Sequence, residues 1–106
     1  MTRTTPSART AALRAVDKRF GEWKDALCEL VRVPGISAAG FLADDLRRSA
    51  QVTADVLGRL GVENVALLDL PGVPPYVYGD WLHAPGAPTV LVYGHHDVVP
   101  PGPVEK

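Results

Sequence analysis

The fold is decided by residues Thr89–Pro100, which read TVLVYGHHDVVP. The first five, Thr89–Tyr93, carry no charge and are rich in β-branched, aliphatic and aromatic side chains. That composition is typical of a strand covered on both faces in an α/β sheet. Gly94 ends this run, a histidine and an aspartate follow two positions apart, and Pro100 cannot continue sheet pairing. The stretch therefore predicts a buried strand that delivers an imidazole and a carboxylate to the edge of a sheet.

Two helices are predicted upstream of this strand. In the first, apolar residues recur every three or four positions up to a stop at Pro34-Gly35, which predicts a face packed on a core. Gly21 weakens its middle, because glycine costs about 1 kcal/mol relative to alanine in a helix. The second helix is expected at residues 42–60, with aspartates in its first turn and Gly61 at its end. The apolar face of the first helix comprises Leu13, Val16, Phe20, Trp23, Leu27 and Leu30.

Two further strands are predicted between the helices and residue 89. They cover Val62–Leu70 and Tyr76–Trp81, with a turn at Pro71-Gly72 between them. The expected order is helix, helix, strand, strand, strand, and the fold class is α/β, with a sheet flanked by helices. Residues 1–8 are polar and are expected to form a disordered tail, and residues 9–106 to form part of one domain.

Composition excludes several classes of function. Eleven basic and twelve acidic residues nearly cancel, and no basic block marks a nucleic-acid binder. No run approaches the ~18 apolar residues of a membrane span, and the N-terminus lacks an apolar signal segment. Cys28 is the single cysteine, so it cannot form an intrachain disulfide, and we expect it to face the core of a helix layer. These features predict a cytoplasmic protein.

His95 and Asp97 are the candidate site residues. Side chains two positions apart in an extended segment point the same way, so these two share a face and His96 points away. A neutral imidazole binds zinc well, and a neighbouring carboxylate can hold its ring and fix its tautomer. The spacing is thus consistent with His95 as one metal ligand and Asp97 as the carboxylate that orients it, and no residue is assigned to an organic cofactor. A His95 ring that faces solvent on a coil, or that turns away from Asp97, would count against this interpretation.

The spacing alone leaves other interpretations open, because a histidine and an aspartate near a turn are commonly a solvated pair. The doublet His96-Asp97 also occurs in helical phosphohydrolases, but the strand-like run before it disfavours that class. A metallo-β-lactamase would need His-x-His-x-Asp-His, which the chain lacks. His83 lies in a loop rich in proline and glycine and is expected to be exposed. A non-catalytic α/β module that binds a partner protein is the main alternative.

Residues 91–101, LVYGHHDVVPP, resemble the first metal-binding motif of the dinuclear zinc peptidases of metallopeptidase family twenty. That family includes carnosine dipeptidase, acetylornithine deacetylase, succinyl-diaminopimelate desuccinylase, aminoacylase and carboxypeptidase G. The motif is most similar to the dipeptidase branch, in which a tyrosine commonly stands at the position of His96. Residues 27–37, LCELVRVPGIS, resemble the first helix of the family and the loop after it. Residues 78–81, YGDW, resemble an element that leads to the site.

The resemblance implies that His95 binds one zinc ion and that Asp97 holds this histidine and counts among the catalytic residues. The complete site of the family holds two Zn²⁺ ions, with Mn²⁺ or Co²⁺ as possible substitutes. It hydrolyses a peptide or N-acyl amide bond with a metal-activated water. The bridging aspartate, the general-base glutamate, the other ligands and the dimerisation domain of the family match no residue of this chain.

Residues 9–106 are therefore expected to be the N-terminal portion of a metallopeptidase catalytic domain, and inactive by themselves. By resemblance, the substrate of the whole protein is a dipeptide or an N-acyl amino acid. A homodimer would form through a domain that this chain lacks. Neither nucleic acid nor a membrane is expected as a partner.

Overall fold

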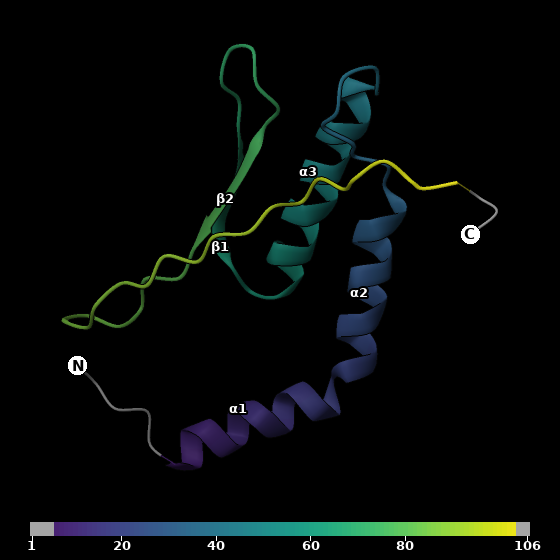
Figure 1. The fold of residues 1–106 in the computed structure, drawn as a ribbon. Helices are drawn as coiled ribbons and strands as arrows, with labels where there is room; N and C mark the ends of the chain where they lie inside the picture. The colour runs from purple at the N-terminus through teal and green to yellow at the C-terminus, as the bar shows by residue number, and fades with distance from the viewer. Residues whose placement is uncertain (1–5, 104–106) are drawn as a thin grey trace.

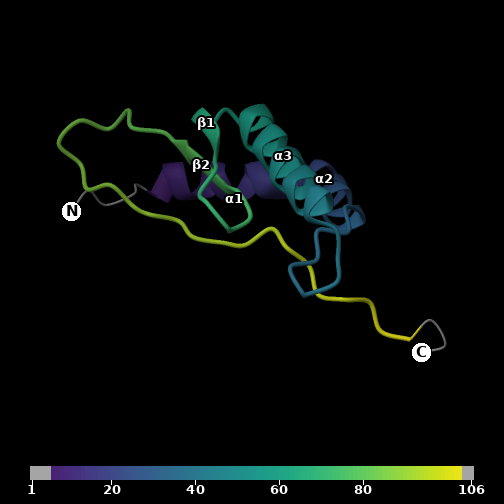
Figure 2. The same cartoon turned by 90° about the horizontal axis from the view of Figure 1, so that it is seen from above.

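A computed structural model describes residues 6–103 and shows three helices and a two-stranded antiparallel sheet (Figure 1). α3 lies beside the sheet on one side and beside α2 on the other, while α1 points away from both (Figures 1 and 2). The predicted α/β class is confirmed. In chain order the elements are α1 (Pro6–Lys18), α2 (Phe20–Arg32), α3 (Ala43–Arg59), β1 (Glu63–Leu68) and β2 (Tyr76–Asp80).

The first predicted helix is two helices, which corrects the expected order of elements. The chain bends at Arg19, whose backbone angles are φ −105° and ψ 15°. Hydrogen bonds from the Arg19 N–H to the Ala15 carbonyl oxygen (3.0 Å) and from the Trp23 N–H to the Arg19 carbonyl oxygen (3.1 Å) bridge the bend. It lies two residues before Gly21, near the weak point that the sequence predicts. Residues 1–5 of the expected tail lie outside the described residues, and α1 begins at Pro6.

The apolar face expected to pack on a core is largely exposed, so this prediction is wrong for the described structure. Phe20 is 63% exposed, and no residue of α2 is buried. Trp23 and Cys28 are half-buried, Trp23 under the guanidinium group of Arg19. The reason is that α3 covers only part of α2, and α1 contacts no described element other than α2. None of the helices between residues 6 and 103 combines the length and apolar character needed to cross a membrane.

The second predicted helix is confirmed as α3. Its first turn holds Asp44 and Asp45, whose negative charges favour a helix N-terminus. At its other end Gly61 has a φ of +86°, a left-handed conformation that glycine adopts without steric cost. The N–H groups of Gly61 and Val62 donate to carbonyl oxygens one turn back, those of Gly58 and Leu57, both at 3.1 Å. This pattern is a Schellman motif, and it turns the chain into the sheet.

The two predicted strands before residue 81 are confirmed as β1 and β2. They pair antiparallel, with Leu68 opposite Tyr76 and Glu63 opposite Asp80. The pairing register shifts between Glu63 and Ala66, where Asn64 has a φ of +52°. Such an irregularity leaves one residue unpaired and bends the strand.

The third predicted strand is absent, and the expectation that it is buried on both faces is wrong. Residues 89–93 form no sheet pairing, and Leu91 and Tyr93 are 92% and 87% exposed. A strand needs a neighbour to accept and donate its backbone hydrogen bonds. Within residues 6–103, β1 pairs with β2 and no further strand lies beside this run. The segment instead runs as extended coil that overlaps the hairpin in Figure 1 and lies apart from the strands in Figure 2.

A small core lies where the loop after α2 meets α3. Gly35 packs so closely on Ser49 that a Cβ atom at residue 35 would lie 2.6 Å from the Ser49 Cβ atom. The same loop holds the C-terminal segment, because the Val98 N–H donates to the Gly35 carbonyl oxygen (2.9 Å) and Val98 forms a parallel bridge with Ile36. The buried residues of this core are Val33, Ile36, Leu46, Ser49, Ala50 and Ala54.

We predict that Gly35→Ala destabilises the chain by about 1–3 kcal/mol, the usual cost of overpacking a filled site. Gly58→Ala is the matched control, because a Cβ atom at that position of α3 meets nothing within 4 Å. It should raise the free energy of unfolding by about 0.5–1 kcal/mol through helix propensity. Urea unfolding measures both variants, and equal stability of the two would contradict the close contact at Gly35.

Candidate metal-binding site

His95 and Asp97 are in direct contact. The Nδ1 atom of His95 lies 2.8 Å from Oδ1 of Asp97 and 3.1 Å from the Asp97 carbonyl oxygen. Both partners are acceptors, so Nδ1 carries a proton and donates it. In the neutral ring the lone pair is then on Nε2, which has no hydrogen-bond partner among the described residues and is free to bind a metal ion.

The sequence predicts that the His95 ring turns toward Asp97 and that it projects from the end of a buried strand. The structure shows the first of these and not the second. The His95 ring turns toward Asp97, as the spacing predicts. It does not project from the end of a buried strand, because residues 89–95 are coil and the His95 side chain is 74% exposed. The contact between the two residues is therefore present, and the exposure of His95 on a coil counts against the metal-site interpretation. The roles of His95 as metal ligand and Asp97 as catalytic residue stay predictions.

Ser37 completes a chain of three hydrogen-bonded side chains. Its hydroxyl group donates to Oδ2 of Asp97 at 2.7 Å, so each carboxylate oxygen of Asp97 has its own donor. The hydrogen bond from Ser37, followed by that from His95, lowers the pKa of Asp97 below its ordinary value, against a smaller opposing effect of burial. Sequence reasoning missed Ser37 as a site residue, because 60 positions separate it from Asp97.

His96 points the other way, into α3. Its Nδ1 atom lies 2.9 Å from the Ser49 hydroxyl oxygen, and that hydroxyl also donates to the His96 carbonyl oxygen at 3.1 Å. The Nε2 atom of His96 lies 3.4 Å from the carbonyl oxygen of Pro75, which is buried. Adjacent histidines thus face opposite sides of one extended segment, as the alternation of side chains predicts.

The ligand set in the described residues is incomplete. Between residues 6 and 103 no group of three or more His, Cys, Asp or Glu side chains could hold a metal ion together. A catalytic zinc ion takes about three protein ligands and keeps one position open. His95 with Asp97 behind it fits one ligand and its orienting carboxylate, and the chemistry of this donor pair suits zinc.

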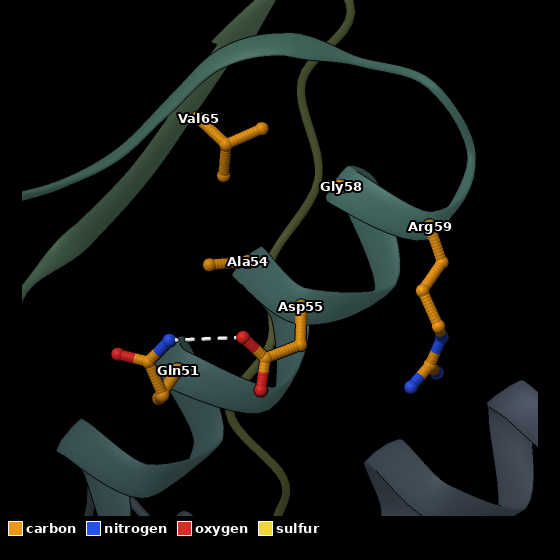
Figure 3. Close-up of a pocket in the computed structure, with 6 residues that line it drawn as sticks. All are labelled: Gln51, Ala54, Asp55, Gly58, Arg59 and Val65. Atoms are coloured by element: carbon orange, nitrogen blue, oxygen red, sulfur yellow. Dashed lines mark hydrogen bonds between the residues drawn. The ribbon is translucent and has the colours of Figure 1, made fainter.

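The remaining candidates lie apart from this pair. His83 is exposed, as its loop position predicts, and contacts the Glu63 carboxylate and the edge of Trp81. A hollow open to solvent lies between α3 and β1, where Gln51 donates to Asp55 at 3.0 Å (Figure 3). It shares no residue with the His95 site. The residues that line it are Gln51, Ala54, Asp55, Gly58, Arg59 and Val65.

The chain is similar to part of a known metallodipeptidase. It is 24% identical to the Cys-Gly metallodipeptidase of Saccharomyces cerevisiae over 102 residues, which covers 86% of this chain and 21% of the yeast protein. The chain therefore spans about a fifth of the length of that relative. No protein-family model matches the chain, and no solved structure matches it. The similarity supports a relationship to metallopeptidases, and with it a metal cofactor in general terms.

We predict that Ser37→Ala raises the pKa of Asp97 toward its ordinary value near 3.8. In the wild type the folded pKa lies below the unfolded one. The charged carboxylate therefore stabilises the fold above about pH 4, and this contribution is lost as the pH falls through the folded pKa. Carbon-detected NMR titration of the aspartate carboxyl groups measures the shift. Asp69, whose pKa is lowered by Arg47, is the internal control and should not move.

Proposed function

We propose that this chain is the N-terminal part of the catalytic domain of a zinc-dependent dipeptidase or related amidohydrolase. The observation that carries the proposal is the hydrogen bond from His95 Nδ1 to Asp97, which leaves Nε2 open, within a motif that resembles such enzymes. The similarity to the yeast metallodipeptidase over 86% of this chain supports the same class.

Each residue of the site would have a separate task. The Nε2 atom of His95 would bind the metal ion, and Asp97 would hold the ring by accepting the Nδ1 proton. Ser37 would keep the carboxylate from rotating, because it donates to the second oxygen. A bound zinc ion supplies the chemistry by lowering the pKa of a bound water and polarising the scissile carbonyl group. The other ligands and the general base would come from residues beyond this site.

The substrate in this proposal is a dipeptide or an N-acyl amino acid. The yeast relative is named for Cys-Gly, which makes that dipeptide the first to test. Two zinc ions per complete site, cytoplasmic location and a homodimer are further parts of the proposal. Mn²⁺ and Co²⁺ are alternatives to test, since imidazole and carboxylate ligands accept them as well.

The proposal is tested by expressing this chain together with whatever its reading frame adds after Lys106. We expect the product to hydrolyse Cys-Gly or another dipeptide when supplied with Zn²⁺, as measured by release of the free amino acid. His95→Ala should lower kcat/KM by at least about 100-fold, because metal-site changes commonly cost 10–100-fold or more. His83→Ala is the matched control and should retain activity.

The 106-residue chain by itself should show no turnover in the same assay, since the described residues supply one plausible ligand. Zinc-dependent hydrolysis by that chain would contradict the proposed division of the site. A longer product that folds, binds zinc and hydrolyses neither dipeptides nor N-acyl amino acids would contradict the proposed function.

The second candidate is a non-catalytic α/β module that binds a partner protein. The exposed run Val90–Tyr93 favours it, because an apolar segment with unpaired backbone groups can pair with another chain. The same run is also expected in a catalytic domain that lacks its remaining strands. The two candidates differ in the behaviour of the chain alone.

We predict that the 106-residue chain self-associates in sedimentation velocity as its concentration rises, as an incomplete domain should. Val92→Lys, in the exposed run, should shift the distribution toward monomer, because a charge opposes edge-to-edge pairing. Ala11→Lys, at an exposed position of α1 outside the apolar face, is the matched control for the added positive charge. A stable wild-type monomer at all concentrations would favour the non-catalytic module.

A further inference from the structure

We infer that Ser49 and His96 form a clamp that positions the His95–Asp97 pair. In this assignment His96 is a positioning residue that touches neither metal nor substrate. Its ring, held on α3, sets the direction in which its two neighbours point. The inference deepens the proposed function and rests on it for the purpose of the pair, while the clamp itself can be measured without any activity.

Ser49 is placed to hold one segment on another. It is 2% exposed, it lies in α3, and Gly35 packs directly on its Cβ atom. A buried hydroxyl group needs hydrogen-bond partners, because its desolvation otherwise costs free energy. The ring and the carbonyl oxygen of His96 supply them, at 2.9 Å and 3.1 Å. Ser49 thereby binds both the side chain and the backbone of the same residue.

Both neutral tautomers of His96 keep this contact. With the proton on Nδ1, the ring donates to the Ser49 oxygen and the hydroxyl donates to the His96 carbonyl oxygen. With the proton on Nε2, the hydroxyl donates to Nδ1 and the ring donates to the Pro75 carbonyl oxygen, 3.4 Å away. The clamp therefore does not depend on a change of charge at His96.

The clamp fixes the direction of the pair through the geometry of an extended chain. Successive side chains of such a segment point to opposite sides. Because His96 is held against α3, His95 and Asp97 must project outward on the same side, where their side chains meet at 2.8 Å. A rotation that released His96 from Ser49 would turn both members of the pair away from their common face.

The described contacts that hold this segment lie at His96 and after it. After Asp97 the chain is held by the Val98 N–H, which donates to Gly35 at 2.9 Å. Before His95, the hydrogen bonds described between residues 84 and 94 stay within that stretch, from the Ala87 N–H to the Ala84 carbonyl oxygen. Ser37 holds the Asp97 carboxylate at 2.7 Å from the other side, so among the described residues the Ser49–His96 contact is the anchor nearest the backbone of His95.

The test follows the tautomer of His95 in the 106-residue chain by long-range proton–nitrogen NMR. At about pH 8.5, two units above the ordinary histidine pKa of about 6.5, the wild type should show the proton on Nδ1. Ser49→Ala and His96→Leu should each lower the ratio of the Nδ1-protonated to the Nε2-protonated form about fivefold. That factor corresponds to the loss of one typical net hydrogen bond.

Two further variants distinguish an effect on the position of the His95–Asp97 pair from a general loss of stability of the fold. His96→Asn places an amide where Nδ1 stands and can bond to Ser49, so it should restore most of the wild-type ratio. Thr53→Val removes the hydroxyl that donates to the Ser49 carbonyl oxygen at 2.9 Å in the same helix. It should lower stability without changing the His95 ratio. Far-UV circular dichroism establishes that each variant is folded.

An unchanged ratio in folded Ser49→Ala and His96→Leu would overturn the clamp, and so would an equal change in Thr53→Val. If both clamp variants unfold, the test is made on the wild-type chain. The absence of a nuclear Overhauser effect between the His96 ring and the Ser49 Hβ protons would then overturn the clamp. Loss of the clamp signature with dipeptide hydrolysis intact in the longer product would leave the proposed function standing. An intact clamp signature with no dipeptide hydrolysis by the longer product would contradict the proposed function and leave the clamp standing.

Discussion

The buried hydroxyl of Ser49 is the constraint on which the site depends. Gly35 covers it from the loop after α2 so closely that no side chain fits at residue 35. Ser49 is buried, so its hydroxyl must bond within the protein, and the ring and carbonyl oxygen of His96 provide the partners. The loop, the helix and the C-terminal segment thus meet at one polar atom. The outward direction of His95 and Asp97 follows from that meeting point.

The sequence predicts well those parts of the fold that depend on residues close together in the chain. α3 ends where Gly61 allows a left-handed turn, and the hairpin forms around Pro71-Gly72 because these residues favour a turn. The contact of His95 with Asp97 belongs to the same group, since two residues in an extended segment set it. In each case the residues responsible lie within a few positions of one another.

The parts that the sequence did not predict depend on contacts between distant residues. Strand-like composition at residues 89–93 describes a preference, but a strand also needs a neighbouring backbone, and the described residues offer none. The exposed face that includes Leu13 and Phe20 likewise lacks a covering layer. Ser37 and Ser49 reach the site across 60 and 47 positions, and nothing in the spacing of serines indicates such pairs.

The exposed run Val90–Tyr93 also affects the order in which the parts of the site become ordered during folding. α2, its loop and α3 are close in sequence, and contacts of this kind form early because they close short loops. The run can gain sheet order once a further backbone lies alongside it. The His95 end of the pair, next to this run, would then be the last element to rigidify. Under the proposed function, the metal ion would then bind after a sheet had formed beside this run.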